Sequence, residues 1–423
     1  MPGTRRPLAV AVMLVAPTAL SAQNAAGHWN GRARLWNRDV GVEVEIVRAG
    51  SDWSGDLTVP QFGVRDLRFS SVTVNGTTVE LTLSAPWSLT FAGKLSQDGD
   101  TLTGQTRGRD SHPFSTVRGL DLTAEREKTL GLPPLTPIAD RAVATLRIPG
   151  SADFLTADEG AAWVTNRDQI QKLEQGRTTP TISATVPDAC GGMVAGAGSI
   201  WAMSCKERTL YRINRSTGER TAVVNTGIAE PNGEMSLAFG AGAVWVVSDS
   251  TGVLSRVDPA TNSVTARIPV LPSTYAATFG FGAVWVTNTA ANSVQRVDPA
   301  TNRVVATIAV GPTPRFITAG EGGVWTLNQG DGSVSRIDPT TNRVAATINV
   351  GVPGNGGDIS AGGGRVFVRA GFVLLSAIDP ASNRVVERYG PVAGSGGVRV
   401  AGDRVWITAH DIETVWVLDT ARR

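Results

Sequence analysis

Histidine, the side chain most often used in acid–base catalysis, is rare in this sequence. Only three histidines occur among 423 residues, and His410 is the one that lies in the C-terminal two-thirds of the chain. A proton-transfer site commonly uses a histidine or a carboxylate held within reach of the substrate. Glu234 is a carboxylate that could share such a site with His410. These two residues are the catalytic candidates of an enzymatic interpretation.

Other chemical motifs are incomplete. The run from Ala393 to Gly397 resembles a nucleophile elbow around Ser395 but lacks the first glycine. The Gly-x-Gly turns each open a β-run, whereas a nucleotide loop leads into a helix. Asp331 in Gly330-Asp331-Gly332 is too isolated for a calcium loop. The sequence therefore indicates no cofactor and no metal site, and a serine hydrolase is disfavoured.

The elements that must position these groups repeat with a period of about forty residues. An aromatic residue follows a glycine-containing turn in each unit, at Trp163, Trp201, Trp245, Trp285, Trp325, Phe367 and Trp406. A second marker, Asp-Pro followed by a Thr-Asn or Ser-Asn pair, occurs at Asp258, Asp298, Asp338 and Asp379. Units with four short β-runs cannot bury their own faces and must stack on neighbours. We therefore predict an all-β fold with a seven-bladed β-propeller over residues 143–423.

One repeat predicts the strands of a blade. In the fifth unit they are residues 316–319, 324–327, 334–337 and 344–348, and the Asp-Pro turn joins the last two. The last unit ends at Leu418 after three strands. The run from Val143 to Ile148 has the pattern of an outer strand. We predict that this N-terminal outer strand completes the last blade and closes the ring.

The blade register collects a mixed set of side chains at one end of the ring. The loops that enter the first strand and leave the second lie there, with Phe154, Arg167, Glu234, Asp249, Tyr275, Asn288, Arg315, Phe316, Asn328, Arg369 and His410. Such groups on a concave end suit a small polar or anionic ligand, and the alternative is that they are solvated loop residues and strand caps. The candidate ligand-binding residues are Arg315, Tyr275, Asn288, Asn328, Phe316 and Asp249.

The same register brings the two cysteines together. Cys190 and Cys205 flank Trp201, on predicted antiparallel neighbouring strands at the mouth of blade two. No cluster of metal ligands accompanies them. A disulfide that pins one loop is therefore the prediction, with two unpaired buried thiols as the alternative.

The repeats resemble the YVTN-type propeller family and, more distantly, the virginiamycin B lyase-like propellers. The resemblance rests on Val-Trp-Val-Thr-Asn at Val284–Asn288 and on the Ile-Asp-Pro-x-Thr-Asn-x-Val run at Ile337–Val344. It implies a rigid exported or surface-exposed propeller with a binding or scaffolding role. The lyases are expected to use histidines with a glutamate on neighbouring blades. Repeated histidines are absent from this sequence.

The N-terminal third predicts a signal segment, a small domain and a linker. Residues 1–22 have two arginines ahead of an apolar run and end at Ser21-Ala22, as secretory signal peptides do. Residues 23–124 alternate in short β-runs with Asn-Gly and Asp-Gly turns, which predicts seven or eight strands in a small antiparallel barrel or sandwich. Residues 125–142 are charged and then proline-rich, as in a semi-rigid linker.

Composition narrows the function classes. The formal net charge is +2, which gives no basic field for nucleic acid. No segment beyond the signal region is apolar for long enough to span a bilayer, so no stable transmembrane anchor is expected. We predict a monomer in the periplasmic or extracellular space.

Three hypotheses follow for function. The leading one is an exported binding or scaffold protein. Its propeller face would bind an unidentified small polar or anionic ligand, or a protein partner. The alternative is a lyase or hydrolase with its active site at the channel mouth. A third is an adhesive module of the cell envelope with an exposed patch on the blade sides.

Overall fold

The computed structural model describes residues 25–421, apart from residues 36–37, 61–63, 85–87, 109, 159, 228–236, 249–250, 352–356, 371–372 and 392–395. The chain divides into two compact units. One contains residues up to 57 together with 68–122, and the other contains 58–67 together with 123–423. The predicted signal segment lies outside the described residues.

The N-terminal sheet is a single antiparallel sheet of nine strands in the order β4-β3-β2-β1-β9-β8-β7-β6-β5. Alternate residues of its second strand, such as Val42 and Val44, are buried, as the sequence pattern predicts. The strands are β1 (Gly27–Leu35), β2 (Arg38–Ala49), β3 (Asp52–Val59), β4 (Val64–Arg68), β5 (Ser71–Asn75), β6 (Thr78–Leu83), β7 (Leu89–Leu95), β8 (Thr101–Arg107) and β9 (Ser111–Arg118).

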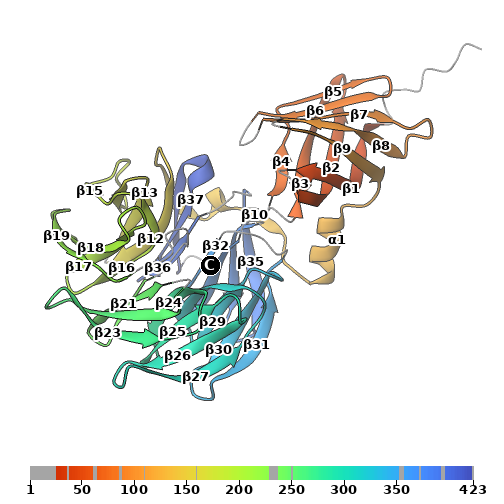
Figure 1. The fold of residues 1–423 in the computed structure, drawn as a ribbon. Helices are drawn as coiled ribbons and strands as arrows, with labels where there is room; N and C mark the ends of the chain where they lie inside the picture. Colours follow the sequence, from red (N-terminus) through yellow and green to blue (C-terminus); the bar gives the residue numbers. More distant parts are fainter. Residues whose placement is uncertain are drawn as a thin grey trace, which may run out of the picture. The chain divides into compact units, whose positions relative to one another are not determined.

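This sheet corrects the prediction of a barrel or sandwich with seven or eight strands. Strand β1 pairs with both β2 and β9, so the beginning and the end of the meander meet in the middle of the sheet. The edges are then β4 and β5, which are not paired with each other in the described residues. A curved half-barrel results (Figure 1). A sandwich would need a second sheet.

The predicted linker is partly ordered along blade six. It contains the end of helix α1 (Leu122–Thr129), the short strand β10 (Leu135–Pro137) and a 3-10 turn (Ile138–Asp140). Strand β10 pairs in parallel with β35 (Arg384–Gly390). The fully buried guanidinium of Arg388 donates to the Glu127 carboxylate at 2.5 Å and to the Pro133 carbonyl at 3.1 Å. These contacts hold the proline-rich segment against the blade.

The C-terminal unit is a seven-bladed β-propeller, which confirms the predicted fold (Figure 1). Blade one contains β12 (Ala152–Asp158), β13 (Ala161–Asn166), β14 (Gln169–Glu174) and β15 (Ile182–Thr185). Blade two contains β16 (Ala189–Gly196), β17 (Ser199–Ser204), β18 (Thr209–Asn214) and β19 (Arg220–Val224). Blade three contains β20 (Leu237–Gly240), β21 (Ala243–Ser248), β22 (Val253–Asp258) and β23 (Ser263–Pro269).

The remaining blades follow the same plan. Blade four contains β24 (Thr274–Gly280), β25 (Ala283–Asn288), β26 (Ser293–Asp298) and β27 (Arg303–Ala309). Blade five contains β28 (Pro314–Gly320), β29 (Gly323–Asn328), β30 (Ser333–Asp338) and β31 (Arg343–Asn349). Blade six contains β32 (Gly357–Gly362), β33 (Arg365–Ala370), β34 (Val373–Asp379) and β35. Blade seven contains β36 (Val398–Ala401), β37 (Arg404–Ala409) and β38 (Thr414–Asp419), and β11 (Ala142–Arg147) pairs antiparallel with β38.

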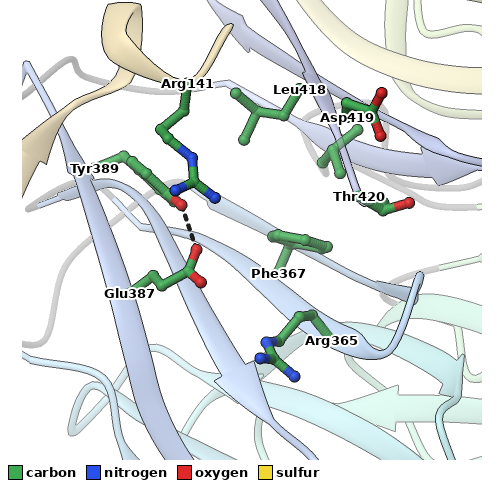
Figure 2. Close-up of a pocket in the computed structure, with 9 residues that line it drawn as sticks. Arg141, Arg365, Phe367, Glu387, Tyr389, Leu418, Asp419 and Thr420 are labelled. Atoms are coloured by element: carbon green, nitrogen blue, oxygen red, sulfur yellow. Dashed lines mark hydrogen bonds between the residues drawn. The ribbon is translucent and has the colours of Figure 1, made fainter. Parts of the chain in front are cut away.

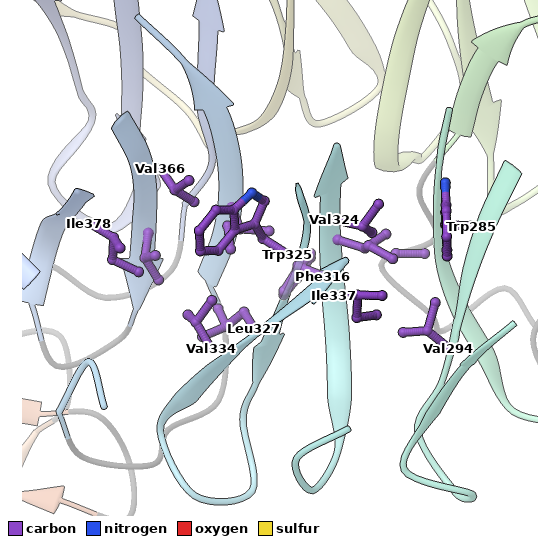
Figure 3. Packing of buried hydrophobic residues seen from close by; sticks show 14 of the residues in the cluster. Trp285, Val294, Phe316, Val324, Trp325, Leu327, Val334, Ile337, Val366 and Ile378 are labelled. Carbon is purple, nitrogen blue, oxygen red and sulfur yellow. The ribbon is translucent and has the colours of Figure 1, made fainter. Parts of the chain in front are cut away.

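The seven aromatic residues of the repeat lie in the core. Six are tryptophans with at most 1% of their surface exposed, and Phe367 is also buried. Figure 3 shows Trp325 among Leu327 and Val334 of its own blade, with Val366 of blade six alongside. The indole Nε1 of Trp325 donates to the Gly320 carbonyl at 2.9 Å. Each such ring therefore fills the space between two blades, as the alternation predicts.

An arginine locks four of these tryptophans to the next blade. Arg296 pairs in register with Trp285, and its guanidinium carbon lies 5.1 Å from the centroid of the ring. Its Nη1 donates at 2.9 Å to both the Pro339 carbonyl and Asn342 Oδ1 in the Asp-Pro turn of blade five. The same arrangement, here called the clamp, uses Arg212, Arg256, Arg296 and Arg336 on the third strands of blades two to five.

The clamp explains the Asp-Pro-x-Thr-Asn sequence more fully than a turn does. Asp338 accepts from the Thr340 amide at 2.8 Å and so holds the turn. Asn342 adopts a left-handed φ of 55°, which asparagine tolerates, and its side chain accepts from Arg296. One short motif therefore forms the turn and also accepts the hydrogen bonds of the arginine from the preceding blade.

Replacing Arg296 by alanine should lower the free energy of unfolding by about 2 kcal/mol, because the charged hydrogen bonds and the cation–π contact are lost together. Urea denaturation followed by circular dichroism measures the change. Arg303→Ala is the matched control, since Arg303 is exposed on the outer strand of the same blade. Equal stability of the two variants would contradict a stabilising clamp.

Candidate functional site

The inner strands of the seven blades form a closed ring around the axis. Each contacts the next, and β36 of blade seven contacts β12 of blade one. The loops that precede these strands and those that follow the second strands lie at one end, here called the mouth. Glu234 and Asp249 lie outside the described residues. Their place in a site therefore stays a prediction.

Three predicted aromatic residues meet at the mouth. Phe154, Tyr275 and Phe316 belong to one buried cluster, and the rings of Tyr275 and Phe316 meet edge to face with centroids 5.5 Å apart. The other members of this cluster come from blades four, five and six. Phe154 of blade one therefore reaches the cluster across the axis. Within the described residues, these three side chains form a buried aromatic cluster, here called the apolar floor.

Arg315 lies beside this floor. Its guanidinium carbon is 5.0 Å from the Tyr275 ring centroid, and the residue is half-buried. The Arg315 carbonyl accepts from Thr287 Oγ1 at 3.1 Å, which anchors the backbone to blade four. Among the described residues, its guanidinium has no hydrogen-bond or ion-pair partner, and its contact is the one with the Tyr275 ring. Within the described part of the propeller, the positive charge of Arg315 therefore has no counter-ion.

Register irregularities turn these side chains toward the mouth. Pairing between β28 and β29 shifts between Pro314 and Phe316, so Arg315 is an extra residue in its strand. Similar irregularities in β24 and β12 include Tyr275 and Phe154. Bulges bend a strand locally and re-aim its side chains. The mouth residues are therefore positioned by departures from regular strand pairing.

The two predicted asparagines have internal partners. Asn288 is 1% exposed and Asn328 is fully buried. Asn288 donates to the Pro272 carbonyl and accepts from the Ala291 amide at 2.7 Å. Asn328 donates to the hydroxyls of Ser333 and Ser335 at 3.0 and 2.9 Å. Both side chains shape the mouth loops and leave little surface for a ligand.

A buried charged cluster lies where blades six and seven meet. Asp358 of β32 is 2% exposed and accepts from the Val398 amide at 3.0 Å and from the Arg399 guanidinium. Burial raises the pKa of Asp358, and Arg399 acts in the opposite direction. Arg369 is fully buried and donates to the Thr408 carbonyl at 3.2 Å. Burial lowers the pKa of Arg369 to about 10, opposed by Asp411, Asp153 and Asp358.

The sequence predicted Arg369 among the mouth residues, but it did not predict this buried cluster or the pair of Asp358 and Arg399. Asp358 and Arg399 are forty-one residues apart and come from two blades. Both lie on inner strands, where the blade register expects mainly small or apolar residues. An Asp at the start of one inner strand and an Arg at the start of the next were the available signal.

Of the remaining predicted residues, Arg167 and His410 are not members of the apolar floor. Arg167 is exposed in the turn after β13, with a left-handed φ of 57°. His410 begins the 3-10 turn His410–Ile412 after β37 and is half-buried. Since Glu234 is outside the described residues, the pairing of Glu234 with His410 stays a prediction.

The predicted disulfide is confirmed. Cys190 on β16 and Cys205 directly after β17 are bonded, with Cα atoms 5.8 Å apart. The Cys205 amide also donates to the Asp188 carbonyl at 3.1 Å. The bond pins a mouth loop of blade two.

The described part of the chain contains no group of three or more His, Cys, Asp or Glu side chains arranged to hold a metal ion. In the same residues, no helix has both the length and the apolar character needed to cross a membrane.

Comparison with known proteins identifies the fold. No family model matches the chain, and no curated protein matches its sequence. Among solved structures, the Neurospora crassa Pan2 WD40 domain is similar with a TM-score of 0.52 and 10% identity, over 65% of this chain and 90% of that one. The structure of U3-55K is similar with a TM-score of 0.57 and 12% identity, over 67% of this chain and all of that one. The likeness supports the β-propeller fold.

Proposed function

We propose that this protein is a binding platform whose propeller mouth captures a small anionic ligand. The unpaired, half-buried guanidinium of Arg315 carries the proposal. It lies on the Tyr275 ring next to the apolar floor of Phe154 and Phe316. A carboxylate or phosphate group would form charge-assisted hydrogen bonds with Arg315, while the apolar part of the ligand would contact the aromatic residues.

The geometry favours an anion over a cation. Arginine presents a planar set of donors that suits bidentate binding of carboxylates and phosphates. The buried carboxylate nearby in the fold, Asp358, already has Arg399 and two backbone amides as partners. Arg315 is therefore the charged residue beside the apolar floor whose charge is not balanced within the described residues.

We further propose that the protein is exported, belongs with the YVTN-type propellers and acts as a monomer. The disulfide supports export, because such bonds persist in oxidising compartments. The Asp-Pro turns and the Val-Trp-Val-Thr-Asn run support the family. The domain division at residues 23–124, 125–142 and 143–423 is part of this proposal, with the N-terminal sheet as a second surface.

We also propose that β11 closes the propeller. It lies before blade one in the sequence and forms the outer strand of blade seven. The ends of the ring would then be joined by a ladder of backbone hydrogen bonds.

A panel of small carboxylates and phosphates, tested by thermal shift on the full chain, should include at least one that raises the melting temperature. Arg315→Ala should weaken binding of that anion about tenfold or more, the equivalent of one charged hydrogen bond. Arg343→Ala, at an exposed arginine on the outer strand of the same blade, should leave it unchanged. If the affinity for the anion were unchanged in Arg315→Ala, the proposed binding site at the mouth would be wrong.

A further inference from the structure

The clamp is missing where blade one meets blade two. Lys172 pairs in register with Trp163, at the place of the clamp arginine. Arg215 and Gly218 take the places of the proline and the asparagine in the receiving turn. The ammonium of Lys172 lies 2.7 Å from the Glu174 carboxylate of its own blade. The side chains that would form the clamp are therefore absent at this junction.

The receiving turn nevertheless keeps the clamp's backbone geometry. Asn214 Oδ1 accepts from the Ser216 amide at 2.8 Å, as Asp298 accepts from the Ala300 amide at 2.9 Å. The Gly218 amide donates to the Asn214 carbonyl at 2.8 Å. This bond matches that from the Asn302 amide to the Asp298 carbonyl. The Arg215 carbonyl thus takes the place of the proline carbonyl that accepts a hydrogen bond from the clamp arginine in the other turns.

Glycine at this turn has a steric cause. Gly218 has a φ of 76°, and a Cβ there would come within 2.5 Å of Ile182 Cγ2 in blade one. Asparagine, which completes the clamp in the other turns, would therefore collide with the neighbouring blade. An asparagine acceptor could therefore be introduced at position 218 only together with a smaller residue at position 182.

An open groove of about 460 Å³ occupies this position, lined by Trp163, Lys172, Glu174, Gln175, Arg215 and Ser216. The other junctions without a clamp are filled by the chain itself. Between blades six and seven, Arg141, Arg365 and the hydrogen-bonded pair of Tyr389 and Glu387 leave a cavity of only about 30 Å³ (Figure 2). Between blades seven and one, Arg404 Nε donates to Gln175 Oε1 at 3.1 Å.

We infer that this groove receives an arginine side chain from a partner protein. Four equivalent slots in the same molecule hold a guanidinium between a tryptophan and the carbonyl of the receiving turn. The groove supplies the Arg215 carbonyl, the Ser216 hydroxyl and the Glu174 carboxylate, whose Oε1 lies 2.7 Å from Lys172. Its cations are Lys172, which Glu174 neutralises, and Arg215, which has contacts within the chain. This inference is independent of the mouth site.

The direct test uses N-acetyl-arginine amide as the probe for the full chain, with the lysine and glutamate analogues for comparison. Saturation-transfer NMR titrations should show the arginine compound binding about tenfold more tightly than either analogue, because the planar guanidinium alone can both stack and donate twice. Tighter binding of the glutamate compound would make the groove an anion site and overturn the inference. Equal binding of all three would overturn it as well.

Lys172→Arg provides the matched variant. It supplies the chain's own guanidinium and should fill the groove, so binding of the arginine probe should fall about tenfold while the fold is retained. Arg343→Ala, remote on blade five, should not change binding. Undiminished binding to Lys172→Arg, with an unchanged circular dichroism spectrum, would show that the probe binds elsewhere.

Discussion

Trp325→Ala is expected to lower the free energy of unfolding by about 4 kcal/mol, the range found when large buried aromatic side chains are removed. Trp325 is fully buried between blades five and six, and three interactions depend on its ring. It packs on apolar residues of both blades, it donates to Gly320, and it supports the guanidinium of Arg336 at 5.0 Å. Urea denaturation monitored by circular dichroism measures the loss.

Trp325→Phe is the control that the chain itself supplies. Blade six has Phe367 at this position and Ala377 where the clamp arginine would be, so the site accepts a phenyl ring when no guanidinium needs support. The phenylalanine variant should lose only about 1–2 kcal/mol, because it gives up the indole hydrogen bond and part of the cation–π contact. A phenylalanine variant as unstable as the alanine variant would mean that burial of the ring is not the main contribution.

The propeller could be predicted because its signals are local and repeated. Blade five was predicted as residues 316–319, 324–327, 334–337 and 344–348, and each range lies inside the corresponding strand, β28 to β31. The N-terminal sheet repeats no motif. Its form depends on the long-range pairing of Trp29 in β1 with Arg118 in β9, which no turn residue or alternation specifies.

The sequence contains a signal for the clamp that the interpretation of the Asp-Pro motif as a turn did not include. Arg256, Arg296 and Arg336 each stand two residues before the aspartate of an Asp-Pro turn. Their strands place them opposite the tryptophan of the same blade. The exceptions were equally visible, since Lys172 and Ala377 occupy the same register position. Only the structure shows that the arginine reaches the turn of the next blade.

The mouth could be predicted as a location but not in its geometry. Phe154, Tyr275 and Phe316 gather as the register suggests, while Arg315 owes its orientation to a bulge that strict alternation cannot foresee. Asn328 faces the protein interior because two serines of its own hairpin accept its amide hydrogens. A repeat therefore places residues at an end of the ring, and local irregularity decides which of them face a ligand.

Ala144→Pro should destabilise the propeller by about 3 kcal/mol if β11 closes the ring. The Ile148 amide donates to the Glu413 carbonyl at 2.8 Å, and hydrogen-bonded pairs alternate along an antiparallel ladder. The pair of Ala144 with Val417 is therefore hydrogen-bonded, and that of Thr145 with Trp416 is not. Proline at Ala144 removes a ladder donor and pulls Leu146 away from its buried site.

The adjacent Thr145→Pro variant separates closure from the general effect of proline. Thr145 is exposed, and its amide points away from β38, where an edge strand tolerates proline. Its cost should stay below about 1 kcal/mol, since no ladder bond is lost. Ala144→Pro should in addition expose the edge of β38, which light scattering would detect as self-association. Equal stability of the two variants, without association, would mean that the β11 ladder does not hold the ring, because only one of the two changes breaks it.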